Sequence, residues 1–231
     1  MTDAPAPRQN VSFASCEGTA HGYLARPASG RGPGLVVIQE WWGLTDHIAD
    51  LVDRFAAQGF VALAPDLYGG TTTHDADRAA RLMRELPVER ATRDLAGAVD
   101  HLLADEGVTS QAVGAVGFCM GGGFVLTLAA QQGERVAAAV PFYGMIGGEV
   151  DLAGLRAAVQ GHFAEHDRMI PLEAVDALAQ RLRDEAGVEP EIHVYDAHHA
   201  FLNDANPATY DADSAREAWD RAVTFLREHV R

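Results

Sequence analysis

The sequence predicts an α/β protein whose mostly parallel sheet is covered by helices on both faces. Short apolar runs alternate, over 231 residues, with longer segments whose apolar positions recur at helical spacing. An alternating order of strands and helices favours a doubly wound parallel sheet. No repeat, low-complexity block or linker divides the chain. We therefore expect a loose Pro/Ala-rich tail over 1–10 and a single domain over 11–231.

The first elements are two short strands and one buried strand. Val11–Ser15 and 21–26 have strand patterns on either side of Glu17-Gly18, which predicts an edge hairpin. The run 35–39 is apolar up to its last residue and rich in β-branched side chains, a pattern typical of a strand buried on both faces.

An amphipathic helix follows this strand. Apolar residues recur at i, i+3, i+4 and i+7 from Ile48 to Phe55, which predicts a helix over 46–58. Gly59 is placed to end it, because glycine accepts the left-handed conformation that often follows a helix.

The remaining elements are assigned by the same two periodicities. Further strands are expected at 60–64, 112–116, 136–141, 160–164 and 191–195. Further helices are expected at 76–86, 93–103, 124–131, 172–185 and 214–229.

Charge and composition exclude some classes of binding partner and indicate the cellular compartment. A formal net charge of −15 argues against nucleic acid or an anionic membrane as a partner. The N-terminus lacks the basic and apolar regions of a signal peptide, and no apolar run approaches the roughly 20 residues of a membrane helix. Two cysteines cannot form a disulfide framework. We expect a cytoplasmic monomer or small homo-oligomer that acts on a small molecule.

The segment 117–122 carries the clearest chemical signal. It reads Gly-Phe-Cys-Met-Gly-Gly and joins the 112–116 strand to the helix that follows. Strand, sharp Gly-x-nucleophile-x-Gly turn and helix form the nucleophile elbow of α/β-hydrolases, here with Cys119 in the place of serine. An inert buried cysteine is the alternative at this position, and Cys16 is assigned a structural role.

α/β-hydrolases order their catalytic residues along the chain as nucleophile, acid and histidine. Asp167 and His199 follow Cys119 in this order, each just after a predicted strand, where such sheets place their sites. His199 would take the thiol proton, and Asp167 would orient the imidazole. Glu165 and Asp196 are alternatives for the acid, and His198 is an alternative for the histidine.

Two backbone N–H groups and one carboxyl are expected beside the elbow. The N–H groups of Trp41 and Met120 occupy the positions of the two oxyanion-hole donors. Glu40 ends the buried strand, where a carboxylate is costly to bury without a partner. Pairing of Glu40 with a surface arginine is the alternative.

Three further histidines flank predicted strands and raise the question of a metal site. The spacing of His162, His166 and His193 matches no recognised ligand set, so we assign them ordinary polar roles and expect no metal.

Together these motifs make the chain resemble the dienelactone hydrolase family over 11–231. The resemblance rests on Gln39-Glu40-x-x-Gly43, Ala64-Pro65-Asp66-Leu67-Tyr68, the elbow, Tyr143-Gly144, the Asp167 turn and His199-Ala200-Phe201. It implies an α/β-hydrolase fold of about eight strands, a Cys119–His199–Asp167 triad, and a Glu40 that hydrogen-bonds the resting thiol and takes its proton once substrate binds. It also implies hydrolysis of enol lactones such as carboxymethylenebutenolide, without a metal or organic cofactor.

The substrate-binding residues are expected by resemblance alone, and one departs from the family pattern. Tyr143 matches a pocket tyrosine. Family members that cleave the dienelactone hold its carboxylate with two arginines, one of them four residues after the histidine, where this chain has Asn203. Arg78 and Arg81 are both candidates for the other arginine. The departure argues against the dienelactone as the preferred substrate and leaves the expected hydrolase chemistry unchanged.

The sequence thus predicts a carboxylic ester hydrolase that acts on small esters or lactones through an acyl-enzyme on Cys119. A thioesterase or acyl transferase on the same fold is one alternative. A non-catalytic ligand-binding or redox protein that uses Cys119 as an oxidisable thiol is another.

Overall fold

The computed structural model describes residues 8–16, 18–146 and 150–231, and these contain an eight-stranded sheet. The strands are β1 Val11–Ser15, β2 Gly18–Ala25, β3 Gly34–Ile38, β4 Val61–Pro65, β5 Val113–Phe118, β6 Val136–Phe142, β7 Ala158–Ala164 and β8 Glu191–Tyr195. The α-helices are α1 Asp46–Ala57, α2 Ala76–Glu85, α3 Val88–Ala104, α4 Met120–Gln132, α5 Leu172–Arg181 and α6 Ala212–His229.

The sheet is mostly parallel, in the order β1-β2-β4-β3-β5-β6-β7-β8. β1 pairs antiparallel with β2, and β2 pairs antiparallel with β4. Every other neighbouring pair is parallel. The predicted fold class, an α/β-hydrolase fold with a mostly parallel sheet of about eight strands, is confirmed.

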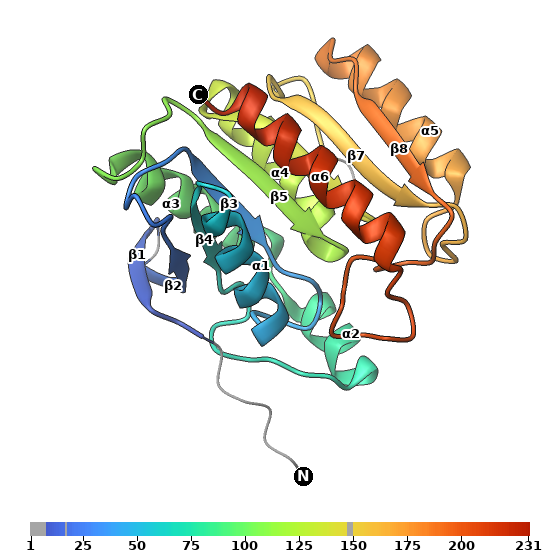
Figure 1. The fold of residues 1–231 in the computed structure, drawn as a ribbon, viewed down its shortest axis with the longest axis horizontal. Helices are drawn as coiled ribbons and strands as arrows, with labels where there is room; N and C mark the ends of the chain where they lie inside the picture. The colour runs from blue at the N-terminus through green and yellow to red at the C-terminus, as the bar shows by residue number, and fades with distance from the viewer. Residues whose placement is uncertain (1–7, 17, 147–149) are drawn as a thin grey trace.

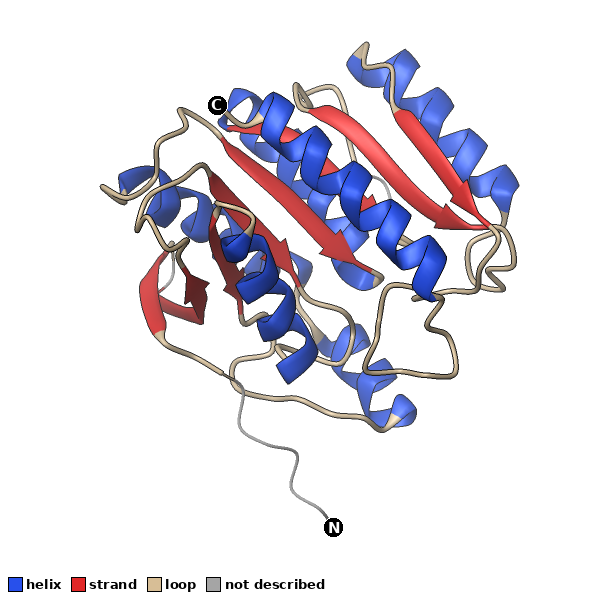
Figure 2. Ribbon diagram, in the orientation of Figure 1, coloured by secondary structure: helices blue, strands red, loops and turns tan. Residues whose placement is uncertain are grey.

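Helices cover both faces of the sheet, as Figures 1 and 2 show. α1 and α6 pack on one face, and α3, α4 and α5 pack on the other. All five residues of β3 are buried, because alternate side chains enter the two cores: Leu35 and Val37 join one, Val36 and Ile38 the other. This double burial explains why the strand is a continuous apolar run.

Several boundaries differ from those predicted, and one of these differences matters for the site. α4 begins at Met120, earlier than the expected start at 124. Glycines are poor helix formers, so propensity hid this first turn, and the close packing of Gly121 against the carbonyl oxygen of Ile38 overrides that propensity. The nucleophile therefore lies directly before the first residue of a helix.

Part of the predicted tail is bound to the sheet. Asn10 donates its backbone N–H to the carbonyl of Gly22, and its side chain exchanges two hydrogen bonds with the backbone of Leu24. Residues 1–7 lie outside the described part of the chain. Among the described residues, no helix combines the length and apolar character that crossing a bilayer requires.

Candidate active site

Cys119 lies in a sharp turn between β5 and α4, with φ 54° and ψ −116°. A non-glycine residue with positive φ is strained, and such strain concentrates at functional sites. The turn closes tightly on both sides: a Cβ on Gly117 would lie 2.3 Å from the carbonyl oxygen of Gly121. The glycines of the elbow are therefore required by contact between its two ends, and Cys119 is held at the end of β5.

The structure brings three of the predicted residues together. His199 Nε2 lies 3.3 Å from Cys119 Sγ, and His199 Nδ1 donates to Asp167 Oδ2 over 2.6 Å. Asp167 follows β7 and His199 follows β8, so both come from carboxyl ends of strands adjacent in the sheet. This is the connectivity of a nucleophile–histidine–acid triad.

Asp167 is fixed by its own turn as well as by His199. Its Oδ1 accepts the backbone N–H groups of Met169 at 2.7 Å and Ile170 at 3.1 Å. Burial raises the pKa of this carboxyl, but the hydrogen bonds from His199, Met169 and Ile170 outweigh burial, and the pKa is lowered overall. Asp167 is therefore a carboxylate at neutral pH.

The environment of His199 favours its charged form. Burial acts to lower its pKa, but the hydrogen bonds to Asp167 and Cys119 and their negative charges raise the pKa to about 10. A protonated imidazole between a carboxylate and a sulfur atom can donate a proton on the side of the sulfur. The site can therefore present a sulfur nucleophile and an adjacent proton donor.

Backbone strain is concentrated around the same residues. Within the described residues, the non-glycine positions with positive φ are Cys119 at 54°, Tyr143 at 35° and Ala200 at 62°. Ala200 follows the histidine directly, and the ring centroid of Tyr143 lies 5.3 Å from that of His199. Strain is therefore stored where the nucleophile and the base are positioned.

Glu40 lies at this site with a buried carboxyl. The residue is 1% exposed, Oε2 accepts a 2.7 Å hydrogen bond from Asn203 Nδ2, and Oε1 has no partner among the described residues. Burial raises the pKa of Glu40 to about 7, against smaller lowering effects of Asn203 and His199. The expected hydrogen bond between Glu40 and the resting thiol differs from this arrangement, in which Glu40 bonds Asn203 and Sγ bonds His199.

The raised pKa predicts that Glu40→Gln stabilises the protein more at high pH than at low pH. A carboxyl whose pKa is about 7 when folded and 4.5 when unfolded makes the folded state bind more protons between these values. The free energy of unfolding of the parent therefore falls as pH rises through this window. The advantage of the variant should grow by about 3 kcal/mol from pH 4 to pH 8. Urea unfolding at both pH values measures it.

The matched control is Glu165→Gln, which neutralises an exposed carboxyl. Its effect on unfolding should be small at either pH. An advantage of Glu40→Gln that is the same at pH 4 and pH 8 would show that folding does not raise the pKa of Glu40.

A cavity of about 260 Å³ opens beside the cysteine. Its lining includes Glu40, Trp41, Cys119, Met169, His199 and Asn203. Trp41 therefore lies at the same cavity as the nucleophile. Met120 is the first residue of α4, and the first N–H groups of a helix have no intrahelical acceptor. The backbone around the cavity is thus suited to hold a developing negative charge.

Three predicted substrate-binding residues differ from expectation. Arg78 and Arg81 are exposed on α2, and neither lines the cavity beside Cys119. Tyr143 is fully buried, packs edge-on against His199 and Phe201, and its hydroxyl has no hydrogen-bond partner within the described part of the chain. It is not among the residues that line this cavity. Asn203 does line the cavity.

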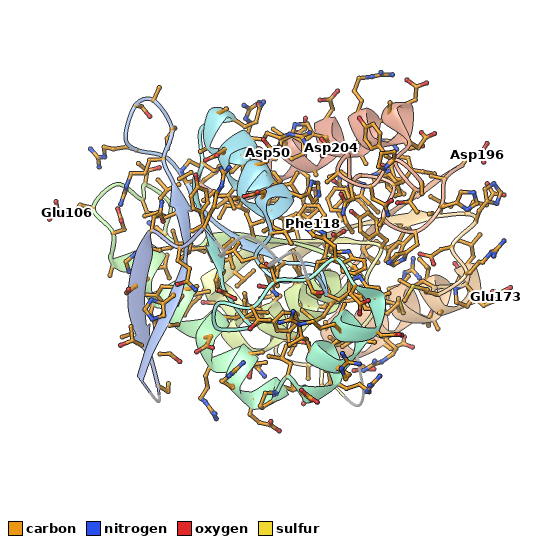
Figure 3. All side chains as sticks on the ribbon, turned by 90° about the horizontal axis from the view of Figure 1, so that it is seen from below. Asp50, Glu106, Phe118, Glu173, Asp196 and Asp204 are labelled. Carbon is orange, nitrogen blue, oxygen red and sulfur yellow. The ribbon has the colours of Figure 1, made fainter. Side chains whose placement is uncertain are left out.

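The alternative acids and histidine lie on the surface. Asp196 accepts a hydrogen bond from exposed His166, and exposed His198 contacts the backbone carbonyl of His166. Figure 3 shows Asp196 at the periphery of the molecule and Phe118, the residue before the cysteine, in its interior. Of the competing residues, the structure therefore places only His199 and Asp167 at Cys119.

The three flanking histidines do not form one group. His162 is buried, bonds Tyr195 and Gln160, and stacks on His193. His166 lies elsewhere, with ligand atoms of Glu165 and Asp196 within 4.8 Å. These three exposed side chains are the described residues best placed to hold a metal ion, and they lie outside the cavity of Cys119.

Sequence reasoning missed three residues of the cavity wall. Met169 is 64% exposed there, and Asn206 and Thr209 lie in a segment without regular structure between β8 and α6. No motif marks any of them. The only signal in the sequence is that Met169 lies two residues after Asp167.

Comparison with known proteins gives one consistent family. The model of the Dienelactone hydrolase family matches residues 20–230. The protein named usf of Aquifex pyrophilus is 33% identical over 96% of this chain and 99% of its own length. A protein of Aquifex aeolicus, named a carboxymethylenebutenolidase as an inferred assignment, is 31% identical over 96% and 99%.

A solved structure agrees with these sequence relatives. A crystal structure from Klebsiella pneumoniae, named a dienelactone hydrolase by a similar inferred assignment, superposes with a TM-score of 0.83 at 32% identity. The match covers 95% of this chain and 100% of that one.

Proposed function

The chain belongs to the dienelactone hydrolase family, and on this premise we propose that it is a cysteine-dependent hydrolase of small esters or lactones. One observation carries the proposal. His199 bridges Cys119 Sγ and Asp167 Oδ2, at 3.3 Å and 2.6 Å, at the wall of a cavity.

The first half of the reaction forms an acyl-enzyme. The thiol proton passes to His199 Nε2, and the sulfur attacks the ester carbonyl carbon to form a carbon–sulfur bond. The carbonyl π electrons move onto oxygen, and the N–H groups of Trp41 and Met120 stabilise that oxyanion. When the carbonyl re-forms, the carbon–oxygen bond to the alcohol breaks, and His199 gives its proton to the leaving oxygen.

The second half of the reaction hydrolyses the acyl-enzyme and regenerates the free enzyme. His199 takes a proton from water, the hydroxide attacks the thioester carbonyl, and the carbon–sulfur bond breaks. The sulfur recovers a proton from His199, and the acid leaves. Throughout, Asp167 orients the imidazole and stabilises its charge. Because the nucleophile must stay a free thiol, the proposal includes a reducing compartment such as the cytoplasm.

A hydrolysis screen tests this function. The panel contains small neutral esters, lactones and the matching thioesters, assayed with the parent and with Cys119→Ala. Turnover of oxygen esters that disappears in the variant is the expected result. Faster turnover of thioesters alone would favour a thioesterase, and stoichiometric oxidation of Cys119 without turnover would favour a redox protein.

Asn203 predicts a preference for substrates without a carboxylate. A carboxylate held by an arginine gains charge-assisted hydrogen bonds, each worth roughly 1.5–3 kcal/mol. Asn203 offers an amide that is already bonded to Glu40. Asn203→Arg should therefore raise kcat/KM for the carboxylated dienelactone by roughly ten- to a hundredfold, relative to a neutral ester. Steady-state kinetics on both substrates measure the change.

The structure offers room for this substitution. Asn203 lines two cavities, of about 260 and 280 Å³, so a longer side chain has space on either side. Asn203→Gln is the control, because it lengthens the side chain without adding charge. Efficient dienelactone hydrolysis by the parent, unchanged in Asn203→Arg, would contradict the prediction.

A further inference from the structure

A third cavity, of about 250 Å³, reaches the nucleophile elbow through Met120. Apolar side chains dominate its lining, among them Leu86, Phe124 and Met145. The hydroxyl of Thr127 also lies there, but it donates to the carbonyl of Gly123 in the preceding turn. The side chains of this cavity, which we call the Met120 cavity, therefore suit an apolar ligand.

The residues of α4 that line the Met120 cavity lie on one face of this helix. Met120, Gly123, Phe124 and Thr127 are spaced i, i+3, i+4 and i+7, so they lie on one side of the helix. This face starts at the residue directly after the nucleophile. A ligand in the cavity would therefore lie along α4, with one end near Cys119.

The mouth of the cavity exposes apolar side chains. Met83, at the end of α2, is 39% exposed, and Val88, at the start of α3, is 54% exposed. Figure 1 shows α2 on the side of the sheet where β3 and β5 end, which is the side of the catalytic residues. Met169, 64% exposed, lines the Cys119 cavity. Exposed apolar groups gathered around two neighbouring cavities are typical of a ligand-binding groove.

Met120 connects the nucleophile elbow with the apolar cavity. Its backbone follows Cys119 directly, and its side chain lines the apolar cavity. The Sδ atom accepts a hydrogen bond from the hydroxyl of Tyr68 at 3.4 Å. Methionine is flexible and fits irregular apolar ligands, so the residue beside the nucleophile can pack against a substrate chain.

We propose that the Met120 cavity binds the aliphatic chain of an ester whose carbonyl carbon is attacked by Cys119. This inference rests on the proposed function and adds the substrate class. A cavity of about 150 Å³ holds a benzene ring, so about 250 Å³ takes a chain of roughly six to ten carbons. Each methylene that leaves water should raise kcat/KM by roughly threefold.

Two series of substrates test the proposal and assign the cavity to the acyl or the alcohol half. The first series contains p-nitrophenyl esters from acetate to decanoate, and the second contains acetates of ethanol to decanol. In one series, kcat/KM should rise by roughly threefold per methylene and level off between about six and ten carbons. Flat or falling values in both series would overturn the proposal.

A variant at the mouth of the Met120 cavity tests whether the dependence of kcat/KM on chain length comes from this cavity. Val88→Trp should lower kcat/KM for the favoured octyl-length substrate by roughly tenfold and leave p-nitrophenyl acetate within about twofold. Val194→Trp is the matched control, since Val194 is 45% exposed on β8 and lies outside both cavities. An equal loss on short and long esters, or an equal effect of the control, would overturn the proposal.

A binding measurement separates this proposal from the hydrolase proposal. Calorimetric titration of the Cys119→Ala protein with 1-octanol and ethanol requires no turnover. Octanol should bind, ethanol should not, and Val88→Trp added to Cys119→Ala should remove octanol binding. If no ester is hydrolysed but octanol binds in this way, only the hydrolase function fails. Octanol that binds no better than ethanol would overturn the cavity assignment.

Discussion

Cys119→Ala should lower ester turnover by about ten-thousandfold or more while leaving the fold intact. The sulfur is the only atom of the proposed site that forms a bond to substrate carbon, so the covalent route ends with its removal. The substitution should not disturb the elbow, because alanine and cysteine both carry a Cβ at the strained φ of 54°. Initial rates measure the loss, and thermal unfolding followed by circular dichroism checks the fold.

Cys16→Ala is the natural control for this experiment. Both cysteines are free, but Cys16 is exposed and distant in sequence from every residue of the cavity. Its removal should leave turnover within about twofold of the parent. If Cys119→Ala retained a tenth of the parent activity, the nucleophile assignment would be wrong.

The fold was predictable because its signals are local. The alternation of strand and helix patterns fixed the class, and β3 is the clearest example, since burial on both faces requires a continuous apolar run. The elbow was readable for the same reason. Gly117 and Gly121 approach each other within one turn, and this contact requires the closely spaced glycines that form the motif.

Some contacts of the site between distant residues could not be predicted, because no motif marks them. The partner of Glu40 is Asn203, 163 residues away, and no sequence motif near either residue predicts this hydrogen bond. Arg78 and Arg81 were expected by resemblance alone, but their exposure depends on how α2 is turned, and only Ala79 of that helix is buried. Tyr143 was expected in the pocket, and the turn after β6 instead places its ring beneath His199.

Neither order along the chain nor residue type alone identifies the acid. Glu165, Asp167 and Asp196 are all carboxyls near strand ends, and all three lie between Cys119 and His199 in the sequence. The turn of Asp167 distinguishes it in the structure, because two backbone N–H groups hold one oxygen and leave the other for His199. The exposed rivals have no such support.

Asp167→Asn should lower kcat by about a thousand- to ten-thousandfold, almost as much as loss of the nucleophile. The amide can keep its oxygen toward the N–H groups of Met169 and Ile170, so the turn should survive. Its NH₂ group would then face His199 Nδ1, which must become an acceptor. The imidazole would carry its proton on Nε2, toward the sulfur, and could no longer accept the thiol proton there.

The pH dependence of the same variant separates this loss from simple misfolding. Asp167 is one of the groups that raise the pKa of His199 to about 10, so the variant should lose protonation of His199 at a lower pH than the parent. NMR titration of the imidazole measures that shift, and kcat measures the catalytic loss. Asp196→Asn, at an exposed carboxyl bonded to His166, is the matched control and should change neither quantity. An unchanged titration of His199 in Asp167→Asn would contradict the role of Asp167, because a 2.6 Å hydrogen bond to a carboxylate cannot be removed without lowering the stability of the imidazolium.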